Sequence, residues 1–433
     1  MQIALPINAL SMSKKILVWF RNDLRLHDNE VLVEAIAKAD EILPVYFFDP
    51  RYFEATSYHT IKTGAVRAQF IRESVEALRQ ALQSFGGNLL VLHGKPEDLL
   101  PGLVTAHNIS EVYHHREVAS EETAVSTHVE DLLWKQKVNL KHIIGHTLYN
   151  KEDLPFPIKD IPDVFAQFKK KTERDAIVKP CFLTPNQINF VALADWGTLP
   201  ELSALLANGE ASNPVINSIF KGGEQQALQT LDELLHFPES NSLKKVDIVA
   251  KLSPWLALGC LSPREVYWKM KHAETSSGSK PFFKHVLQGL LWRDYYRFMF
   301  KKHGNTFFKA KGFTQTVTQA VADEKSLQAW KTATTGQPLV NLLMKQLNET
   351  GFITNAARLL VATYFVYELK LEWVLGAAYL EERLIDYAPA SNWGNWANVA
   401  GVGNDIKLTN GYGFDKQLKI FDPKGMYTPT INA

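Results

Sequence analysis

The sequence of 433 residues holds only two cysteines, Cys181 and Cys260, and they lie far apart. Two such cysteines make neither a disulfide framework nor a cysteine-based metal site, and they fit a reducing cytoplasm. No uninterrupted apolar run is long enough to cross a bilayer, so we expect no membrane partner. The opening segment has no basic n-region and is broken by Pro6, which argues against a secretory signal; Met12 is as good a start as Met1.

An excess of charge of one sign is also absent, because 47 basic side chains are balanced by 46 acidic ones. This balance gives no global attraction to nucleic acid, so a DNA-facing groove would have to be a local basic patch. No GxGxxG or P-loop motif follows a strand candidate, so a Rossmann dinucleotide site has little support. The composition is that of an ordinary globular protein, long enough for two or three domains.

Short apolar strand candidates alternate with helical patterns in the first half of the chain. The first strand candidate starts near Lys14, and the others are Ile42–Phe48, Leu89–His93, Glu111–His115 and Leu140–Ile144. Helical patterns lie between them at Asn29–Lys38, Gly64–Ser84, Pro96–Ala106 and Ser120–Lys137. Such alternation predicts an α/β domain over residues 14–150, with a parallel sheet covered by helices on both faces.

The pattern changes twice in the second half. Residues 151–213 are punctuated by prolines and carry a basic run at Lys169–Lys171, which predicts an interdomain linker. From residue 214 to 433 strand signals vanish, and apolar helical periodicity appears at Phe282–Phe300 and Ala356–Leu384. We therefore expect a large all-helical second domain.

The run from Leu384 to Asp405, LIDYAPASNWGNWANVAGVGND, concentrates unusual chemistry. It holds one carboxylate near its start, then amides and two indoles in a segment broken by Pro389 and Gly394. Short amides favour caps and turns, and a buried tryptophan requires a partner for its N–H. The run predicts a polar, aromatic pocket wall that fits a flat cofactor, although a capped helix end with buried tryptophans has the same residues.

This run, LIDY followed by SNWGNW and AGVGND, resembles the photolyase/cryptochrome flavoproteins, and specifically their DASH branch. RNDLRLHDN, FKGGEQQAL, KLSPWLALGCLSPREVY and LLWRDYYRFMF resemble other segments of that family, so the resemblance extends over nearly the whole chain. It implies an α/β antenna domain followed by a helical domain that binds FAD. Without the family, RNDLRLHDN is expected to be a charged loop held by internal ion pairs.

The resemblance also implies which residues bind the flavin. Leu252 and Ser253 would close over its phosphates and ribityl chain, while the residues near its ring would be Arg293, Asn355, Arg358, Asp386 and Asn392. Arg358 and Asp386 are expected to pair across two helices, and Asn392 to face the flavin N5. Ser253 precedes a proline, so a helix N-cap is its alternative role.

Trp396 and then Trp373 would pass an electron to the photoexcited flavin, although two core tryptophans are the simpler interpretation. The third tryptophan of the family's series aligns with Ala320, so this route is truncated or diverted. Detours through Phe313, Tyr364 and Tyr367 stay open.

The resemblance further places Trp292 and Asn355 where a flipped pyrimidine dimer would bind, although Trp292 also belongs to an apolar helical stripe. Glu117 matches the acidic residue that holds a folate antenna, 5,10-methenyltetrahydrofolate; its alternative role is a helix-cap residue. The adjacent His114 and His115 should point to opposite faces of a strand, which makes the pair a poor metal site.

Several positions depart from the family pattern. Gly289 replaces a glutamate that hydrogen-bonds the dimer, and Ala356 and Ser240 replace arginines that face DNA, so DNA binding should be weaker than in the family. Residues near the cofactor also differ, at His236, Val249, Ala250 and Ala388. Each lost donor to a buried phosphate oxygen costs ~1 to 3 kcal/mol, which would lower flavin affinity.

Three functions follow from these observations. The first is a blue-light-responsive cryptochrome whose flavin charge is sensed near Arg358 and Asp386 by an unknown signalling partner. The second is a photolyase that repairs cyclobutane pyrimidine dimers, in single-stranded DNA for example. The third is a binding scaffold that no longer holds flavin.

Overall fold

A five-stranded parallel sheet forms the N-terminal half of the computed structural model, which describes residues 13–206, 216, 218–235, 250–277, 280–314, 320–409 and 412–423. The strands are β1 Lys15–Phe20, β2 Glu41–Phe48, β3 Leu90–His93, β4 Ile109–His115 and β5 Asn139–Ile143, in the spatial order β3-β2-β1-β4-β5. All five expected strands are present, with ends within two residues of those expected from the sequence.

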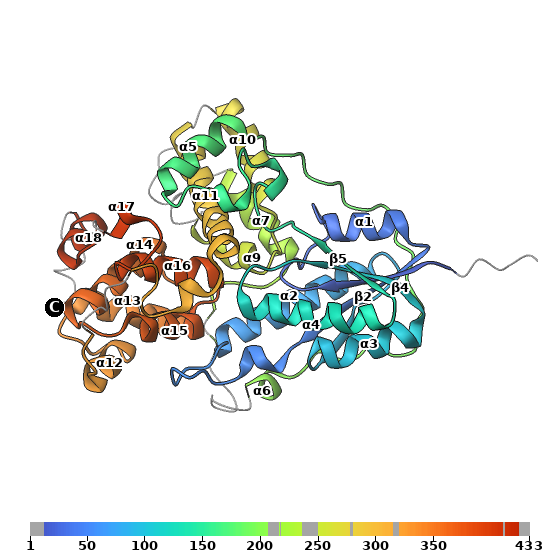
Figure 1. Cartoon of the computed structure of the whole chain (residues 1–433), viewed down its shortest axis with the longest axis horizontal. Coiled ribbons are helices and arrows are strands. Elements are labelled where there is room, and N and C mark those ends of the chain that lie inside the picture. The colour runs from blue at the N-terminus through green and yellow to red at the C-terminus, as the bar shows by residue number, and fades with distance from the viewer. Residues whose placement is uncertain are drawn as a thin grey trace, which may run out of the picture.

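Helices cover both faces of the sheet, as the alternation of patterns predicts (Figure 1). They are α1 Glu30–Lys38, α2 Ala65–Gln83, α3 Pro96–His107 and α4 Ser120–Lys135. Successive residues of β1 face opposite cores: Ile16 and Val18 pack with α1 and α2, whereas Leu17 and Trp19 pack with α3 and α4. Because β1 is buried on both faces, its sequence is a continuous apolar run.

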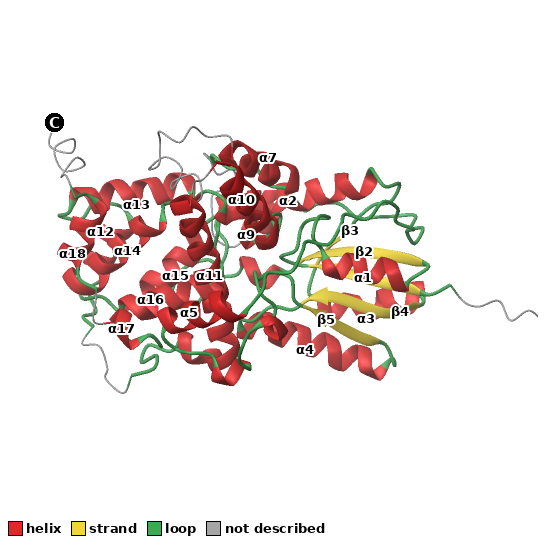
Figure 2. Ribbon diagram, turned by 90° about the horizontal axis from the view of Figure 1, so that it is seen from above, coloured by secondary structure: helices red, strands yellow, loops and turns green. Residues whose placement is uncertain are grey.

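The second half is helical over its described residues, and Figure 2 shows the strands confined to the other end of the molecule. The helices after the sheet are α5 Phe165–Asp175, α6 Leu202–Leu205, α7 Glu224–Leu235, α9 Ser253–Ala257, α10 Pro263–Ser277, α11 Lys280–His303, α12 Glu324–Lys331, α13 Pro338–Thr350, α14 Asn355–Thr363, α15 Trp373–Arg383, α16 Pro389–Val399, α17 Ile406–Thr409 and α18 Phe414–Phe421. No helix among the described residues is long and apolar enough to span a membrane.

The apolar stretch Ala356–Leu384 is helical as its periodicity predicts, but it is divided between α14 and α15. After α14 the backbone makes a π-helical turn at Tyr364–Glu368, and Lys370 then adopts a left-handed φ of 53°. The helix cannot continue through such a residue, so α15 starts afresh at Trp373. Periodicity alone misses the break because the residues on both sides of it are apolar.

The expected linker also contains a packed helix. In α5 the side chains of Phe165 and Phe168 are buried against Tyr295 of α11, at ring-centroid distances of 5.4 and 5.6 Å. The basic run Lys169–Lys171 belongs to this helix, and Lys170 and Lys171 are exposed.

The loop after β1 joins the two halves. Asp28 and Arg264 of α10 form a buried ion pair with N–O distances of 2.7 and 3.0 Å. The Glu224 carboxylate of α7 accepts the backbone N–H groups of Leu26 and His27 at 3.0 and 2.9 Å. The loop is thus held mainly by the helical half, and the expectation of internal ion pairs was wrong because sequence does not show partners this distant.

Candidate functional site

An ion pair lies at the centre of the helical half. Arg358, on α14, donates through Nη2 to both carboxylate oxygens of Asp386, at 2.8 and 2.7 Å. Asp386 lies in the turn between α15 and α16, so the expected pairing of these residues is confirmed, with the carboxylate on a turn rather than a helix. The Asp386 side chain is only 3% exposed, so its carboxylate is held inside the protein by its pairing with Arg358.

The Ser253 hydroxyl binds the same carboxylate, 2.5 Å from its Oδ2 atom. Ser253 is the first residue of α9, while Leu252 occupies the N-cap position and is buried. The alternative N-cap role of Ser253 was therefore wrong, since its hydroxyl serves Asp386 and lies 2.8 Å from the carbonyl oxygen of Ala250.

Asn392 lies in the first turns of α16, which follows the turn that holds Asp386. Its Nδ2 atom donates to the carbonyl oxygen of Ala377 on α15 at 3.0 Å, and this fixes the orientation of the buried amide. Arg358 keeps 22% of its side chain exposed, so an edge of the guanidinium is accessible to a ligand. An arginine edge, a paired carboxylate and an oriented amide make a donor and acceptor set that fits a flat, polar heterocycle.

Two other expected flavin residues, Arg293 and Asn355, have surroundings that differ from those of the ion pair. Arg293, on α11, donates to the carbonyl oxygens of His146 and Leu256, and thereby links the loop after β5 to α9. Burial, followed by the charge of Arg297, lowers its pKa to about 10. Asn355 is exposed at the start of α14. His236 and Val249, as well as Ser240, lie outside the described residues.

The two expected electron donors lie on neighbouring helices. Trp396 of α16 packs on Gly376, one turn after Trp373 on α15, and both indoles are buried. Trp373 also has an aromatic neighbour that the sequence did not single out, because its ring centroid lies 5.8 Å from that of Trp393. Ala320, at the position of the third donor, is exposed.

Trp292 is stacked within an aromatic cluster. Its ring lies parallel to that of Phe165, with a centroid distance of 3.4 Å and an interplanar angle of 11°. Tyr295 and Tyr296 each lie 5.6 Å from it. A nucleobase could stack on the face that Phe165 covers only after α5 moved. Sequence reasoning missed Phe165 because it placed residues 151–213 in a linker.

A cavity of about 670 Å³ lies between the two halves. Its walls combine Arg21, Tyr52 and Glu122 from the α/β half with Tyr387 and Trp393 from the helical half. Burial, and then the neighbouring charge of Glu117, raises the pKa of Glu122 to about 8, so this wall carries a neutral carboxylic acid near neutral pH.

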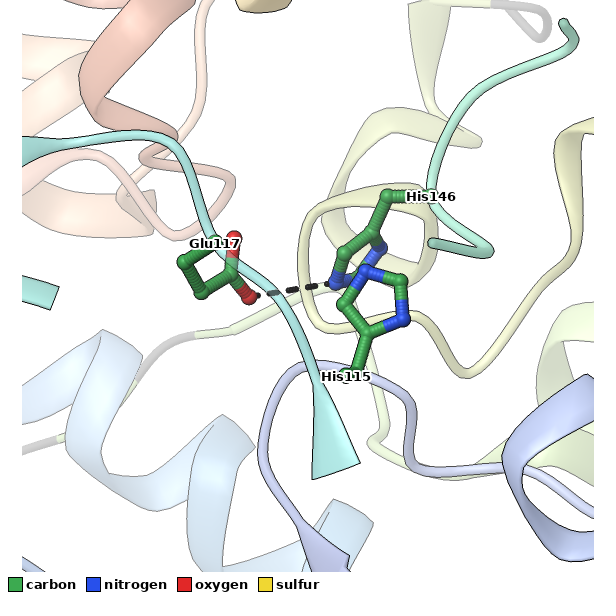
Figure 3. Close-up of side chains that lie close together, drawn as sticks. All are labelled: His115, Glu117 and His146. Carbon is green, nitrogen blue, oxygen red and sulfur yellow. Dashed lines mark hydrogen bonds and ion pairs between the residues drawn. The ribbon is translucent and has the colours of Figure 1, made fainter. Parts of the chain in front are cut away.

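Glu117 also lines this cavity, although it is 3% exposed. Figure 3 shows its carboxylate directed toward His146. It accepts hydrogen bonds from His146 Nε2 at 3.2 Å, Asn22 Nδ2 at 2.9 Å and Arg297 Nη2 at 3.0 Å. It precedes α4 by three residues, so its alternative role as a helix-cap residue was wrong. Burial opposes ionisation, but these donors hold the pKa of Glu117 well below its usual value.

His115 completes the group drawn in Figure 3, and the possible ligand atoms of His115, Glu117 and His146 lie within 4.8 Å of one another. Burial and neighbouring charges lower the pKa of both imidazoles. The Glu117 carboxylate already has its three donors, including the cationic Arg297, so the group is neutralised without a metal ion. His114 points to the other face and stacks on Trp19, as expected for adjacent strand residues.

Comparisons with known proteins match both halves of the chain. The DNA photolyase family model matches residues 16–186, and the model for the FAD binding domain of DNA photolyase matches residues 286–430. A cryptochrome DASH of Gloeobacter violaceus is 38% identical over 425 residues, covering 96% of this chain and 85% of the relative. A cryptochrome DASH of Danio rerio is 37% identical over 430 residues, covering 96% and 83%.

Solved structures show the same fold. The crystal structure of a Synechocystis cryptochrome has a TM-score of 0.87 at 36% identity, covering 96% of this chain and 88% of that one. An archaeal photolyase from Sulfolobus tokodaii has a TM-score of 0.77 at 24% identity, covering 96% and 90%.

Proposed function

We propose that this chain, which belongs to the photolyase and cryptochrome family, is a blue-light-responsive flavoprotein of the cryptochrome DASH type. It would bind FAD among its C-terminal helices. The observation that carries this proposal is the ion pair of Arg358 with the buried Asp386, together with the fixed orientation of the buried Asn392 amide. Such a pair costs desolvation and is weak evidence of a structural role. A function for the pair follows if it binds the flavin ring, which gains negative charge on reduction.

FAD, when bound, would supply the absorption of blue light and the acceptance of an electron. Arg358 would stabilise negative charge on the ring through its accessible edge, and Asp386 would hold that guanidinium in place. Asn392 would turn its amide toward the flavin N5, and Leu252 and Ser253 would lie along the phosphates and ribityl chain. These contributions are preorganised electrostatics, because the groups are fixed by their own hydrogen bonds.

We further propose that Trp396 and Trp373 supply the electron. Both indoles are buried, so the positive charge that each carries after losing an electron is shielded from bulk water. A partner that senses the changed charge near Arg358 would complete a signalling function. A cytoplasmic location is part of this proposal and is supported by the two unpaired cysteines.

The cavity between the halves would hold the antenna, 5,10-methenyltetrahydrofolate, with Glu117 on its wall. The volume of about 670 Å³ is within the range of small-molecule sites. The aromatic rings of Tyr52 and Trp393 give it flat surfaces, and the neutral Glu122 can donate a hydrogen bond as well as accept one.

Repair of pyrimidine dimers is the second candidate, and Trp292 with Asn355 motivates it. The stacking of Phe165 on Trp292 and the absence of a side chain at Gly289 count against efficient repair. DNA binding weaker than that of other family members is what we expect. A scaffold without flavin is the third candidate, motivated by the altered residues Ala250 and Ala388.

An absorption spectrum of protein purified in the dark tests the proposal. We expect a flavin spectrum, or its appearance after incubation with FAD and desalting. The variant Arg358→Gln should bind FAD at least tenfold more weakly, since a lost charged hydrogen bond costs about 1.5 to 3 kcal/mol. Arg174→Gln, at an exposed arginine of α5, is the control and should bind as the wild type does.

Colourless protein that takes up no FAD would reject both light-driven functions and leave the scaffold. Repair of a thymine-dimer oligonucleotide under blue light, lost in Trp292→Ala, would favour the photolyase function over the cryptochrome function. A Trp396→Phe variant should bind FAD normally but lose photoreduction; persistent photoreduction would reject the proposed electron donor.

A further inference from the structure

Trp393 extends the aromatic series beyond Trp373. Its ring centroid lies 5.8 Å from that of Trp373, with an interplanar angle of 75°. Trp393 also lies 6.2 Å from Tyr58 and lines the cavity between the two halves, together with Tyr387 and Glu381. Buried Trp373 is thus one ring away from the wall of that cavity.

The detours considered from the sequence lead elsewhere. The ring contacts of Phe313 are with His303 and Phe307, and Tyr364 packs on Phe414 of α18. Tyr367 donates its hydroxyl to the carbonyl oxygen of Val399, which cannot take up a proton.

Tyr387 and Glu381 add a proton acceptor to the series. The Nε1 atom of Trp393 donates to the Tyr387 hydroxyl oxygen and to the Glu381 carboxylate, both at 3.2 Å. The Tyr387 hydroxyl oxygen and the Glu381 carboxylate therefore both lie beside the same N–H group. A phenol that loses an electron becomes strongly acidic, so a carboxylate that shares the Trp393 N–H with it is placed to accept the released proton.

Electrostatics around Tyr387 favour this transfer. The guanidinium carbon of Arg67 lies 4.6 Å from the centre of the Tyr387 ring, and its charge opposes a second positive charge there. Burial raises the pKa of Tyr387, so the hydroxyl keeps its proton at rest, and burial also raises the pKa of Glu381, which makes its carboxylate a better base.

We propose that Trp393 and Tyr387 carry the electron hole from Trp373 to the cavity between the two halves, with Glu381 as the proton acceptor. The inference rests on the proposed photoreduction of FAD, because the photoexcited flavin is the oxidant that first takes an electron from Trp396 and Trp373. Trp393 then gives one electron to oxidised Trp373, and Tyr387 gives one electron to oxidised Trp393. The hydroxyl proton moves from Tyr387 to Glu381, which leaves a neutral phenoxyl radical and a carboxylic acid.

The cycle is completed at the cavity. When no antenna fills the cavity, a soluble one-electron reductant, such as a thiolate or ascorbate, reduces the Tyr387 radical, and the proton returns from Glu381 to the phenolate. No net oxidation of the protein remains, and the electron on the flavin has come from the reductant. Tyr387 and Tyr58 are both half-buried at the cavity wall, unlike Trp373.

Flash photolysis of the FAD-loaded protein is the first test. We expect a phenoxyl radical after the flash, seen by its visible absorption and by electron paramagnetic resonance, and formed more slowly in heavy water. Tyr387→Phe should remove this signal. Trp393→Phe should shorten the lifetime of the charge-separated state by an order of magnitude, and Trp393→Tyr, which keeps an oxidisable ring of nearly the same shape, should restore most of it.

Tyr379→Phe is the matched control. Tyr379 is buried and lies 5.5 Å from Trp330, which is itself 6.3 Å from Trp396, so it sits at the end of a comparable series. Its hydroxyl lies 3.1 Å from the carbonyl oxygen of Lys331 and 2.7 Å from Oδ1 of Asn348, neither of which accepts a proton at neutral pH. Its phenoxyl signal and lifetime should therefore equal those of the wild type.

Flavin-free protein gives an independent test. Azide radicals produced by pulse radiolysis oxidise indoles in preference to phenols, and electron transfer from a tyrosine then converts indolyl into phenoxyl absorption. The phenoxyl yield should fall in Trp393→Phe and in Tyr387→Phe but not in Tyr379→Phe. Equal yields and lifetimes in all four proteins would overturn the inference. If the wild type took up no FAD, the proposed function would fail, and the radiolysis experiment would still decide the route.

Discussion

The indole of Trp396 rests directly on Gly376: a Cβ atom at residue 376 would lie 2.3 Å from Cη2 of that ring. Real Cβ atoms do not make contacts so short, and Trp396 is only 2% exposed, so its ring has little room to retreat. Glycine at this position is therefore what allows α15 and α16 to place the proposed electron donor.

Replacing Gly376 by alanine should destabilise the protein although alanine is the better helix former. The gain in helix propensity is about 1 kcal/mol, whereas overpacking a buried ring costs about 1 to 3 kcal/mol. Urea unfolding should therefore show a lower midpoint, and photoreduction of bound FAD should slow because the ring is displaced. An increase in stability would show that the contact relaxes at no cost.

Gly289→Ala should have the opposite effect. Gly289 lies inside α11, is exposed, and a Cβ atom there would meet nothing within 4 Å. Only helix propensity changes, so we expect a gain of about 0.5 to 1 kcal/mol in the free energy of unfolding. The two alanine variants, measured side by side, separate backbone preference from packing.

Asp28→Asn should destabilise strongly, because it leaves Arg264 buried without its counter-charge. The Asp28 and Arg264 side chains are 0% and 5% exposed. Removing one partner of a buried pair costs about 3 to 5 kcal/mol. Glu349→Gln, which breaks an exposed pair with Lys345, is the control and should change the unfolding free energy by less than about 0.5 kcal/mol. Similar effects of the two variants would contradict the assignment of Asp28.

Glu122→Gln should change how stability depends on pH. The pKa of Glu122 is raised from 4.5 to about 8, so between these values the folded protein keeps a proton that the unfolded chain releases. The free energy of unfolding contributed by this group therefore falls as pH rises through that window. The glutamine variant lacks this loss, so its stability relative to wild type should rise from pH 4.5 to pH 8, by no more than about 5 kcal/mol. Parallel pH curves would show that Glu122 is ionised in the folded protein.

The sheet and its helices follow from local pattern, because a strand such as β1 is buried on both faces and its apolar run is visible in the sequence. The ion pair of Arg358 with Asp386 was likewise expected, from the resemblance. The break before α15 was not, since it depends on the backbone conformation of Lys370 among apolar neighbours.

Contacts between segments that lie far apart in the sequence also could not be predicted from it. Trp393 lies in the same motif as Trp396, three residues earlier, yet sequence gave no sign that it faces Trp373 and the cavity. Phe165 was assigned to a linker, so its stacking on Trp292 was missed. The roles of Leu252, Asn355 and Glu117 toward ligands remain proposals.

The loop after β1 has a consequence for biosynthesis. Asp28 leaves the ribosome 236 residues before Arg264, and Leu26 leaves it 198 residues before Glu224. During most of translation the loop lacks these contacts with the helical half, and only those within the α/β half, such as that of Asn22 with Glu117, can form. A shortened chain that ended before α10 would never gain Arg264, so Asp28 would lack this buried counter-charge and the loop after β1 would not complete its native contacts.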